Sequence, residues 1–139
     1  MKRLAIDVQP GEYSVARLDP AEGVPAELFA HASGALVSVT RTDSEVSVIC
    51  PTHVWRAFSS AGTESSGRAE EGWRLLSVRG PLEFTLTGII AALSSELAAA
   101  GVALFSLSTY DTDHLLVKAT DLARAVDALE LSGHDVHSG

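Results

Sequence analysis

Short segments in which apolar and polar residues alternate fill the first part of the chain and predict strands, because alternation places the apolar side chains on one face. LAIDV (4–8) and YSVARL (13–18) are separated by QPGE, a sequence typical of a tight turn. These two segments predict a hairpin. ALVSVT (35–40) and EVSVICP (45–51) predict a second hairpin around a polar loop.

Helical segments and a polar break complete this part of the chain. VPAELFAH (24–31) predicts a short helix with a proline in its first turn, and THVWRAF (52–58) predicts two helical turns. In SSAGTESSGRAEEG (59–72), Ser, Gly, Glu and Thr replace apolar residues almost completely, which is typical of a linker or a long exposed loop. The predicted organisation is an N-terminal unit at 1–60, a linker at 61–72 and a C-terminal unit at 73–139.

The chain beyond residue 72 predicts the element order β-α-β-β-α-β. Apolar residues recur at helical spacing in LTGIIAALSSELAAAG (86–101), and Gly101 ends this helix. The order is that of a ferredoxin-like sandwich, and the first part of the chain has nearly the same elements in shifted order. The predicted fold class is therefore α+β, with two ferredoxin-like units in tandem, the N-terminal one rearranged. The remaining predicted elements are strands at 73–80, 102–108, 114–118 and 134–137 and a helix at 121–133.

An internal repeat supports two related units. Placing SVTRTDSEVSVI (38–49) on SLSTYDTDHLLV (106–117) pairs Ser38 with Ser106 and Asp43 with Asp111. Both copies consist of an apolar strand, a polar loop with two acids and a second apolar strand. We interpret the pattern as a duplication.

Composition narrows the function classes. The 139 residues include 18 acidic and 10 basic ones, giving a formal net charge of −8, and the basic residues are scattered. A basic patch for nucleic acid or for an anionic membrane is therefore missing. The single cysteine, Cys50, excludes an intramolecular disulfide and suggests a reducing compartment. Since no apolar run is long enough for a signal peptide or a membrane span, we predict a cytoplasmic protein.

The sequence gives little support for a catalytic function. The phosphate-loop signature and the dinucleotide glycine pattern are absent, and we predict no enzymatic activity, no cofactor and no metal. Cys50 near His53 allows a thiol nucleophile, but its strand pattern favours a small buried hydrophobe. His114 allows a metal ligand or proton carrier, although a satisfied histidine is more common. His134 and His137 allow weak metal binding, but we favour a final strand with a frayed end.

The segment WRLLSVRGPLEFTLTGIIAALSSELAAAGVALFSLSTYDTDHLLVKATDLARAVDALELSGHDV (73–136) resembles the ACT-domain family, in particular its tandem branch with the CASTOR-type arginine sensors and the regulatory tails of aspartate kinases. GPLEFTLTGI (80–89) and STYDTDHLLV (108–117) carry the most specific likeness, and 13–50 carries a weaker one. The resemblance implies two ACT units side by side, with a free amino acid or similar small metabolite bound where they meet.

A ligand site can be assigned on this basis. A helix N-terminus presents unpaired N–H groups to a carboxylate, and acidic side chains suit an ammonium group or a cationic side chain. The alternative is a solvated turn whose polar side chains bond their own backbone. The backbone at Leu86, Thr87 and Gly88 would meet the carboxylate, and Asp111 is one of the hairpin acids that suit the cationic group. The resemblance implies ligand contacts at Thr109 and Asp113 in the hairpin, with Ser38 and Val39 on the equivalent strand of the first unit facing the ligand from the other side.

Two functions remain open. The first is a non-catalytic, amino-acid-binding regulator, expected as a homodimer, that passes its ligand state to a protein partner. The second is an interaction module that assembles through sheet edges and binds no metabolite.

Overall fold

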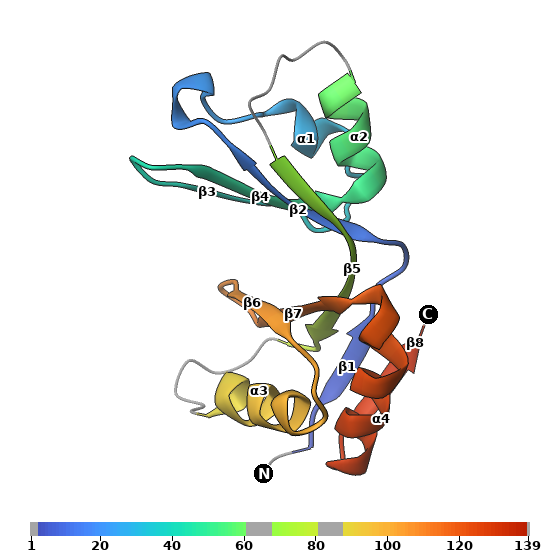
Figure 1. Ribbon diagram of the computed structural model, residues 1–139. Helices are drawn as coiled ribbons and strands as arrows, with labels where there is room; N and C mark the ends of the chain where they lie inside the picture. The colour runs from blue at the N-terminus through green and yellow to red at the C-terminus, as the bar shows by residue number, and fades with distance from the viewer. Residues whose placement is uncertain (1–2, 61–67, 81–87, 139) are drawn as a thin grey trace. The chain divides into compact units, whose positions relative to one another are not determined.

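The computed structural model describes residues 3–60, 68–80 and 88–138 (Figure 1). The chain divides into two compact units. Residues 11–73 form the first unit, and residues 1–10 combine with 74–139 in the second unit. Each unit has its own hydrophobic core. None of the helices in the described ranges is long and apolar enough to cross a membrane.

The first unit is an antiparallel sheet with its helices on one face (Figure 1). Its strand order is β3-β4-β2-β5, and its chain order is β-α-β-β-α-β, as in a ferredoxin-like sandwich. The strands are β2 (Tyr13–Leu18), β3 (Ser38–Arg41), β4 (Val46–Pro51) and the first half of β5 (Arg68–Val78); the helices are the 3₁₀ turn η1 (Pro20–Glu22), α1 (Glu27–Ala30) and α2 (Thr52–Ser60).

Alternation along β4 builds the core of the first unit. Val46, Val48 and Cys50 are fully buried and pack with Leu28 of α1 and Trp55 of α2. Burial raises the pKa of the Cys50 thiol to about 11, so the reactive thiolate is scarce at neutral pH. The prediction of Cys50 as a small buried hydrophobe is confirmed.

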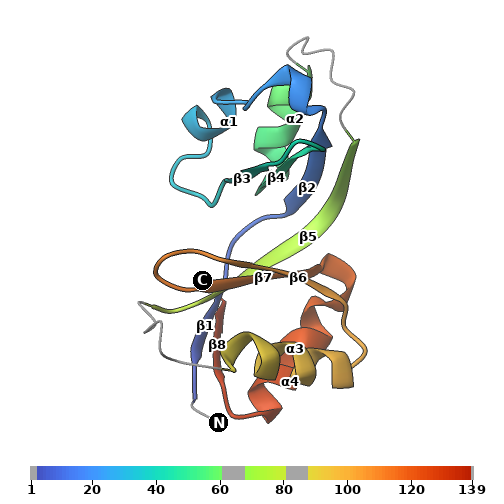
Figure 2. The ribbon, with the colours of Figure 1, turned by 90° about the vertical axis from the view of Figure 1, so that its left-hand side faces the viewer.

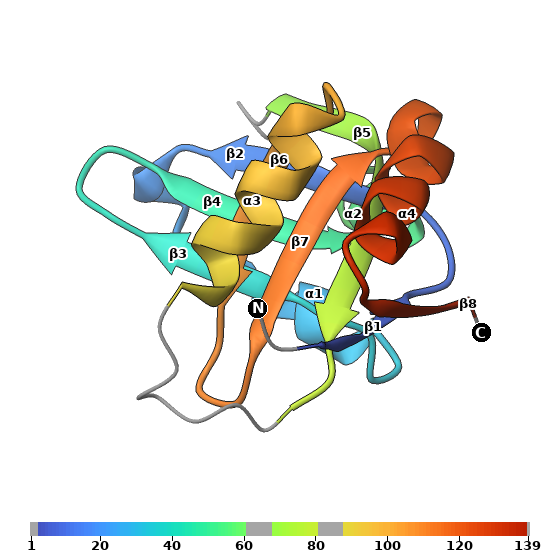
Figure 3. The same ribbon diagram turned by 90° about the horizontal axis from the view of Figure 1, so that it is seen from below.

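The second unit has the strand order β6-β7-β5-β1-β8. Figures 2 and 3 show its two α-helices together on one face of this sheet. Apolar residues of both helices and the central strands form its core, with Leu76, Leu93, Leu97, Leu115 and Leu129 fully or almost fully buried. The elements are β1 (Ala5–Val8), the second half of β5, α3 (Ile89–Ala99), β6 (Leu104–Ser108), β7 (Asp113–Lys118), the 3₁₀ turn η2 (Ala119–Asp121), α4 (Leu122–Leu131) and β8 (Asp135–Ser138).

Strand β1 is the extra strand of the second unit. It pairs antiparallel with β5 and parallel with β8, and Leu4, Ile6 and Val8 point into the core. The predicted hairpin between 4–8 and 13–18 is therefore wrong. Alternation correctly identifies both segments as strands, but it does not specify which strand each one pairs with.

Strand β5 explains a second difference between the predicted and the observed fold. Its first residues, 68–72, were expected in the linker because they are polar, yet they pair with β2 as an exposed edge strand. This strand completes the regular order of the first unit, so the N-terminal unit is not rearranged. Instead, the second unit departs from the regular order, because it contains the extra strand β1. Residues 61–67 of the predicted linker lie outside the described residues.

Candidate functional site

The β6–β7 turn holds the acidic part of the predicted site. The backbone N–H of Thr109 donates to the Thr112 carbonyl at 2.8 Å, and the Thr109 hydroxyl donates to the same carbonyl at 3.2 Å. Asp113 accepts a short bond from the Ser108 hydroxyl. The Thr109 hydroxyl and one carboxylate oxygen of Asp113 therefore already have partners within the hairpin. Asp111 is exposed at the turn.

The start of α3 provides the other part of the predicted site in the second unit. Gly88 occupies the N-cap position with a φ of 81°, a left-handed conformation that disfavours any residue with a Cβ. A Cβ added at Gly88 would meet no atom within 4 Å, so the conformation explains this glycine and a close approach does not. Leu86 and Thr87 lie outside the described residues. Figures 1 and 3 show the start of α3 and the β6–β7 turn at the same end of this unit.

Ser38 and Val39 belong to the first unit. They lie on β3, where Ser38 pairs with Ile49 and Val39 pairs with Val48. The Val39 side chain packs against the core of the first unit, so only its backbone is suited to a ligand contact. Ser38 is half-buried and points to the opposite face of the strand.

The two hairpins are equivalent, but the repeat is one residue out of register. The Thr42 N–H donates to the Glu45 carbonyl at 2.9 Å, and this bond matches the Thr109–Thr112 bond. Thr42 therefore corresponds to Thr109, whereas the sequence alignment placed Arg41 there. The buried faces of the strands agree with this register, because Val48 of β4 is buried in the first core and the corresponding Leu115 of β7 is buried in the second core. A one-residue shift exchanges the two faces of a strand, so the sequence alignment pairs side chains that point in opposite directions.

His114 is bonded on the face of β7 opposite Leu115. Its Nδ1 lies 2.8 Å from the Ser77 hydroxyl of β5. Burial lowers the pKa of His114, and the neighbouring Asp113 carboxylate opposes this shift. Across the described residues, no group of three or more His, Cys, Asp and Glu side chains could hold a metal ion. The hydrogen bond to Ser77 supports the interpretation of His114 as a satisfied histidine.

We expect His114 to make the stability of the chain depend on pH. Because its pKa is lowered below the usual 6.5 in the folded state, the unfolded chain binds the proton first as pH falls. The contribution of His114 to the free energy of unfolding is therefore fully present above 6.5 and is lost as pH falls from that value toward the folded pKa. Urea unfolding at a series of pH values measures this decline.

The matched comparison is His114→Gln, which keeps a hydrogen-bonding group but cannot titrate. The decline should be smaller in this variant than in the parent. An identical pH dependence in the parent and in His114→Gln would contradict the assignment.

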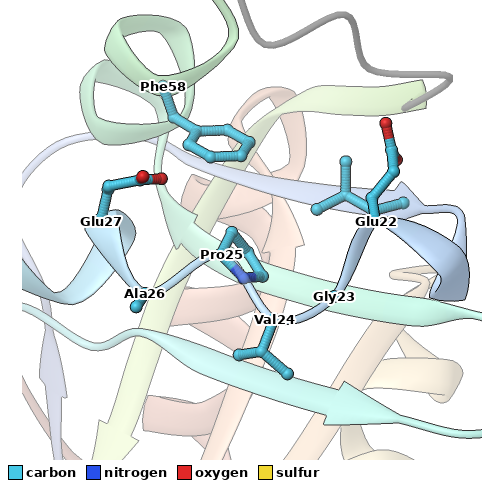
Figure 4. Close-up of a pocket in the computed structure, with 8 residues that line it drawn as sticks. Glu22, Gly23, Val24, Pro25, Ala26, Glu27 and Phe58 are labelled. Atoms are coloured by element: carbon cyan, nitrogen blue, oxygen red, sulfur yellow. The ribbon is translucent and has the colours of Figure 1, made fainter.

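A pocket in the first unit was not anticipated from the sequence. It has a volume of about 240 Å³ and lies between η1, α1 and the end of α2. Figure 4 shows the Phe58 ring above Pro25, with the carboxylates of Glu22 and Glu27 on either side. The two acids in PAEGVPAEL, which flank an apolar turn, were the available signal. The lining residues are Leu18, Glu22, Gly23, Val24, Pro25, Ala26, Glu27 and Phe58.

Comparisons with family models agree with the fold. The ACT-domain model matches residues 68–130, which cover β5 to the end of α4 and thus most of the second unit. A second family model, described as an N-terminal domain, matches residues 11–54 in the first unit.

Curated relatives include the cytosolic arginine sensor for mTORC1 subunit 1 of several mammals. The mouse protein is 33% identical over 88 residues, which are 61% of this chain and 26% of that protein. The human protein is 36% identical over 69 residues, which are 49% of this chain and 20% of that protein. The chain thus spans about a quarter or less of the length of these relatives.

Solved structures extend the similarity to the whole chain. Protein Atu0741 from Agobacterium tumefaciens is 33% identical, with a TM-score of 0.82 over 100% of this chain and 96% of that chain. The regulatory subunit of aspartate kinase from Thermus thermophilus is 12% identical, with a TM-score of 0.65 over 92% of this chain and 96% of that chain. The second likeness concerns the fold alone, and it confirms the predicted pair of ferredoxin-like units.

Proposed function

This chain belongs to the ACT-domain family, and we propose that it is a non-catalytic regulatory protein that binds a free amino acid or a similar small metabolite. The observation that carries the proposal is the 33% identity to the mouse arginine sensor over 61% of this chain. The name of that relative assigns it to amino-acid sensing in the cytosol. We propose the same compartment and the same type of role here.

We further propose that the ligand contacts both units. In the second unit, the backbone at Leu86, Thr87 and Gly88 would meet a carboxylate, and Thr109, Asp111 and Asp113 would meet an ammonium group or cationic side chain. In the first unit, Ser38 would contribute its hydroxyl and Val39 its backbone. Support comes from the exposure of Gly88 and Asp111. Because Thr109 and Asp113 are bonded within the hairpin, a ligand would have to share or replace those bonds.

We expect one of the twenty amino acids to stabilise the chain when each is added at millimolar concentration. A ligand at about a hundred times its dissociation constant adds roughly 2.7 kcal/mol to the free energy of unfolding, which raises the melting temperature by several degrees. A thermal-shift panel measures this directly and identifies the ligand. In Asp113→Ala, affinity for that ligand should fall at least about tenfold, because a hydrogen bond to a charged group contributes roughly 1.5–3 kcal/mol.

Asp127→Ala is the matched control, since Asp127 is an exposed acid on α4, an element that carries none of the predicted contacts. It should bind with unchanged affinity. A ligand that binds Asp113→Ala as tightly as the parent would place its site elsewhere in the chain.

The alternative function is an assembly module without a metabolite ligand. Strand β3 pairs only with β4 among the described residues, so its other edge offers backbone groups to a further strand. A flat amino-acid panel together with a stable dimer in light scattering would favour this function. A homodimer with a regulated protein partner remains part of the first proposal, and the same light-scattering measurement tests the dimer.

A further inference from the structure

We propose that His134 is a pH-sensitive latch for strand β1, and that proton uptake by its ring releases the start of this strand from the second unit. The His134 side chain is 1% exposed, and every group in the latch belongs to the second unit. The latch is independent of the proposed amino-acid site, because none of the predicted ligand contacts is a histidine.

Two hydrogen bonds select the neutral form of the His134 ring. The Leu4 N–H donates to Nδ1 at 3.2 Å, so this nitrogen carries no proton. The ring proton therefore lies on Nε2, which is 3.0 Å from the Glu96 carboxylate. Histidine is the side chain that ordinarily changes its charge between about pH 5 and 8. A charged ring carries protons on both nitrogens, so its Nδ1–H would point at the Leu4 N–H.

The charged groups around His134 can accommodate a positive ring. The elements next to the ring are β1, α3, α4 and β8, since His134 bonds Leu4 and Glu96 and its backbone N–H donates to the Leu129 carbonyl at 3.1 Å. Acids outnumber arginines on these elements, and the Glu96 carboxylate bonds the ring directly, so the charged ring keeps one partner while it loses the other. The charged and titratable residues are Arg3 and Asp7 at β1, Glu96 on α3, Arg124, Asp127 and Glu130 on α4, and Asp135 and His137 on β8.

Proton uptake should affect only the start of β1. The backbone of Leu4 is held on both sides, because its N–H bonds the His134 ring and its carbonyl accepts the Asp135 N–H at 2.9 Å. The next bond along the strand involves no histidine, since the Arg79 N–H donates to the Ala5 carbonyl at 2.8 Å. We therefore expect Leu4, which is 4% exposed, to separate from the ring while the strand beyond Ala5 stays in the sheet.

The test is amide hydrogen exchange of the full chain, measured by NMR at a series of pH values between about 8 and 5. Each rate is expressed as a protection factor, which corrects for the effect of pH on exchange itself. As the ring takes up its proton, the protection factor of the Leu4 amide should fall at least about tenfold, or about 1.4 kcal/mol, within the usual cost of a buried N–H that loses its acceptor. The Asp135 amide should follow, while the Arg79 amide keeps its protection.

Variants assign the change to His134. His134→Gln supplies an acceptor that takes up no proton, so protection of the Leu4 amide should stay constant over the pH series. Glu96→Gln removes the negative partner of the charged ring and should move the fall to lower pH. His114→Gln is the matched control, because His114 is a titratable histidine of the same unit that bonds Ser77 instead of β1, and it should leave the fall at Leu4 unchanged.

The NMR signals of the His134 ring report its proton uptake in the parent chain, so the test does not depend on whether a variant folds. A ring that takes up its proton while the Leu4 amide keeps its protection would overturn the proposal. A ring that stays neutral down to about pH 5, or an equal fall at Leu4 in His134→Gln, would overturn it as well.

Discussion

Ile6→Ala is expected to destabilise the second unit by about 2–5 kcal/mol, the usual cost of truncating a buried isoleucine. Ile6 is fully buried, and it pairs with Val78 on one side and Val136 on the other. Its side chain packs in the core that contains Leu76 and Leu129. The loss therefore falls on the unit made mainly of residues 74–139, although Ile6 lies at the opposite end of the sequence.

Amide hydrogen exchange shows which of the two units is destabilised. In Ile6→Ala, amides of β7 and α4 should exchange faster, while amides of β2 and β4 keep their protection. Val48→Ala is the reciprocal variant, because Val48 is fully buried in the core of the first unit. It should give the reverse pattern. Faster exchange confined to β2 and β4 in Ile6→Ala would show that β1 belongs with the first unit after all.

His134→Ala should cost about 2–3 kcal/mol. The His134 Nδ1 accepts the Leu4 N–H at 3.2 Å, so the ring proton lies on Nε2 and donates to Glu96 at 3.0 Å. The side chain is 1% exposed. Truncation leaves the buried Leu4 N–H without an acceptor, which costs about 1–3 kcal/mol, and the lost ring adds a cavity term. Urea unfolding at neutral pH measures the change.

His137→Ala is the control, because His137 is exposed three residues further along the chain. It should stay within about 0.5 kcal/mol of the parent, as is usual for surface substitutions. His134→Gln restores an acceptor and a donor on a flexible chain and should recover part of the loss. Equal stability of His134→Ala and His137→Ala would remove the structural role assigned to His134.

Much of the fold could be predicted from local pattern. Alternation predicts β2, β3 and β4, an apolar run predicts β7, and helical spacing predicts α3 and α4, because each element places apolar side chains in one of the two cores. The pairing of β1 could not be predicted this way, since β5 and β8 lie far from it in the sequence. The first half of β5 was hidden by its polarity, which is what an exposed edge strand requires.

The functional residues were harder to predict. The turn at Thr109 has a composition that suits both a ligand site and a self-bonded loop, and composition does not show the bonds that Thr109 makes within the turn. His134 was expected near a frayed end, because its partners Leu4 and Glu96 belong to distant segments. The pocket under Phe58 also depends on segments that meet only in the fold.

The placement of β1 has a consequence for how the chain acquires its structure during synthesis. Every strand of the first unit lies between Tyr13 and the first half of β5, so that unit can close while later residues are still being translated. The apolar segment LAIDV leaves the ribosome earlier, but of its two partners β5 ends at Val78 and β8 ends only at Ser138, and the helices α3 and α4 that cover its apolar face also come late. At roughly 5–20 residues per second, this strand waits for several seconds with its apolar side chains uncovered. Strand β1 is thus made before the strands of the first unit but is buried after them, and it is open to chaperones and to aggregation in the interval.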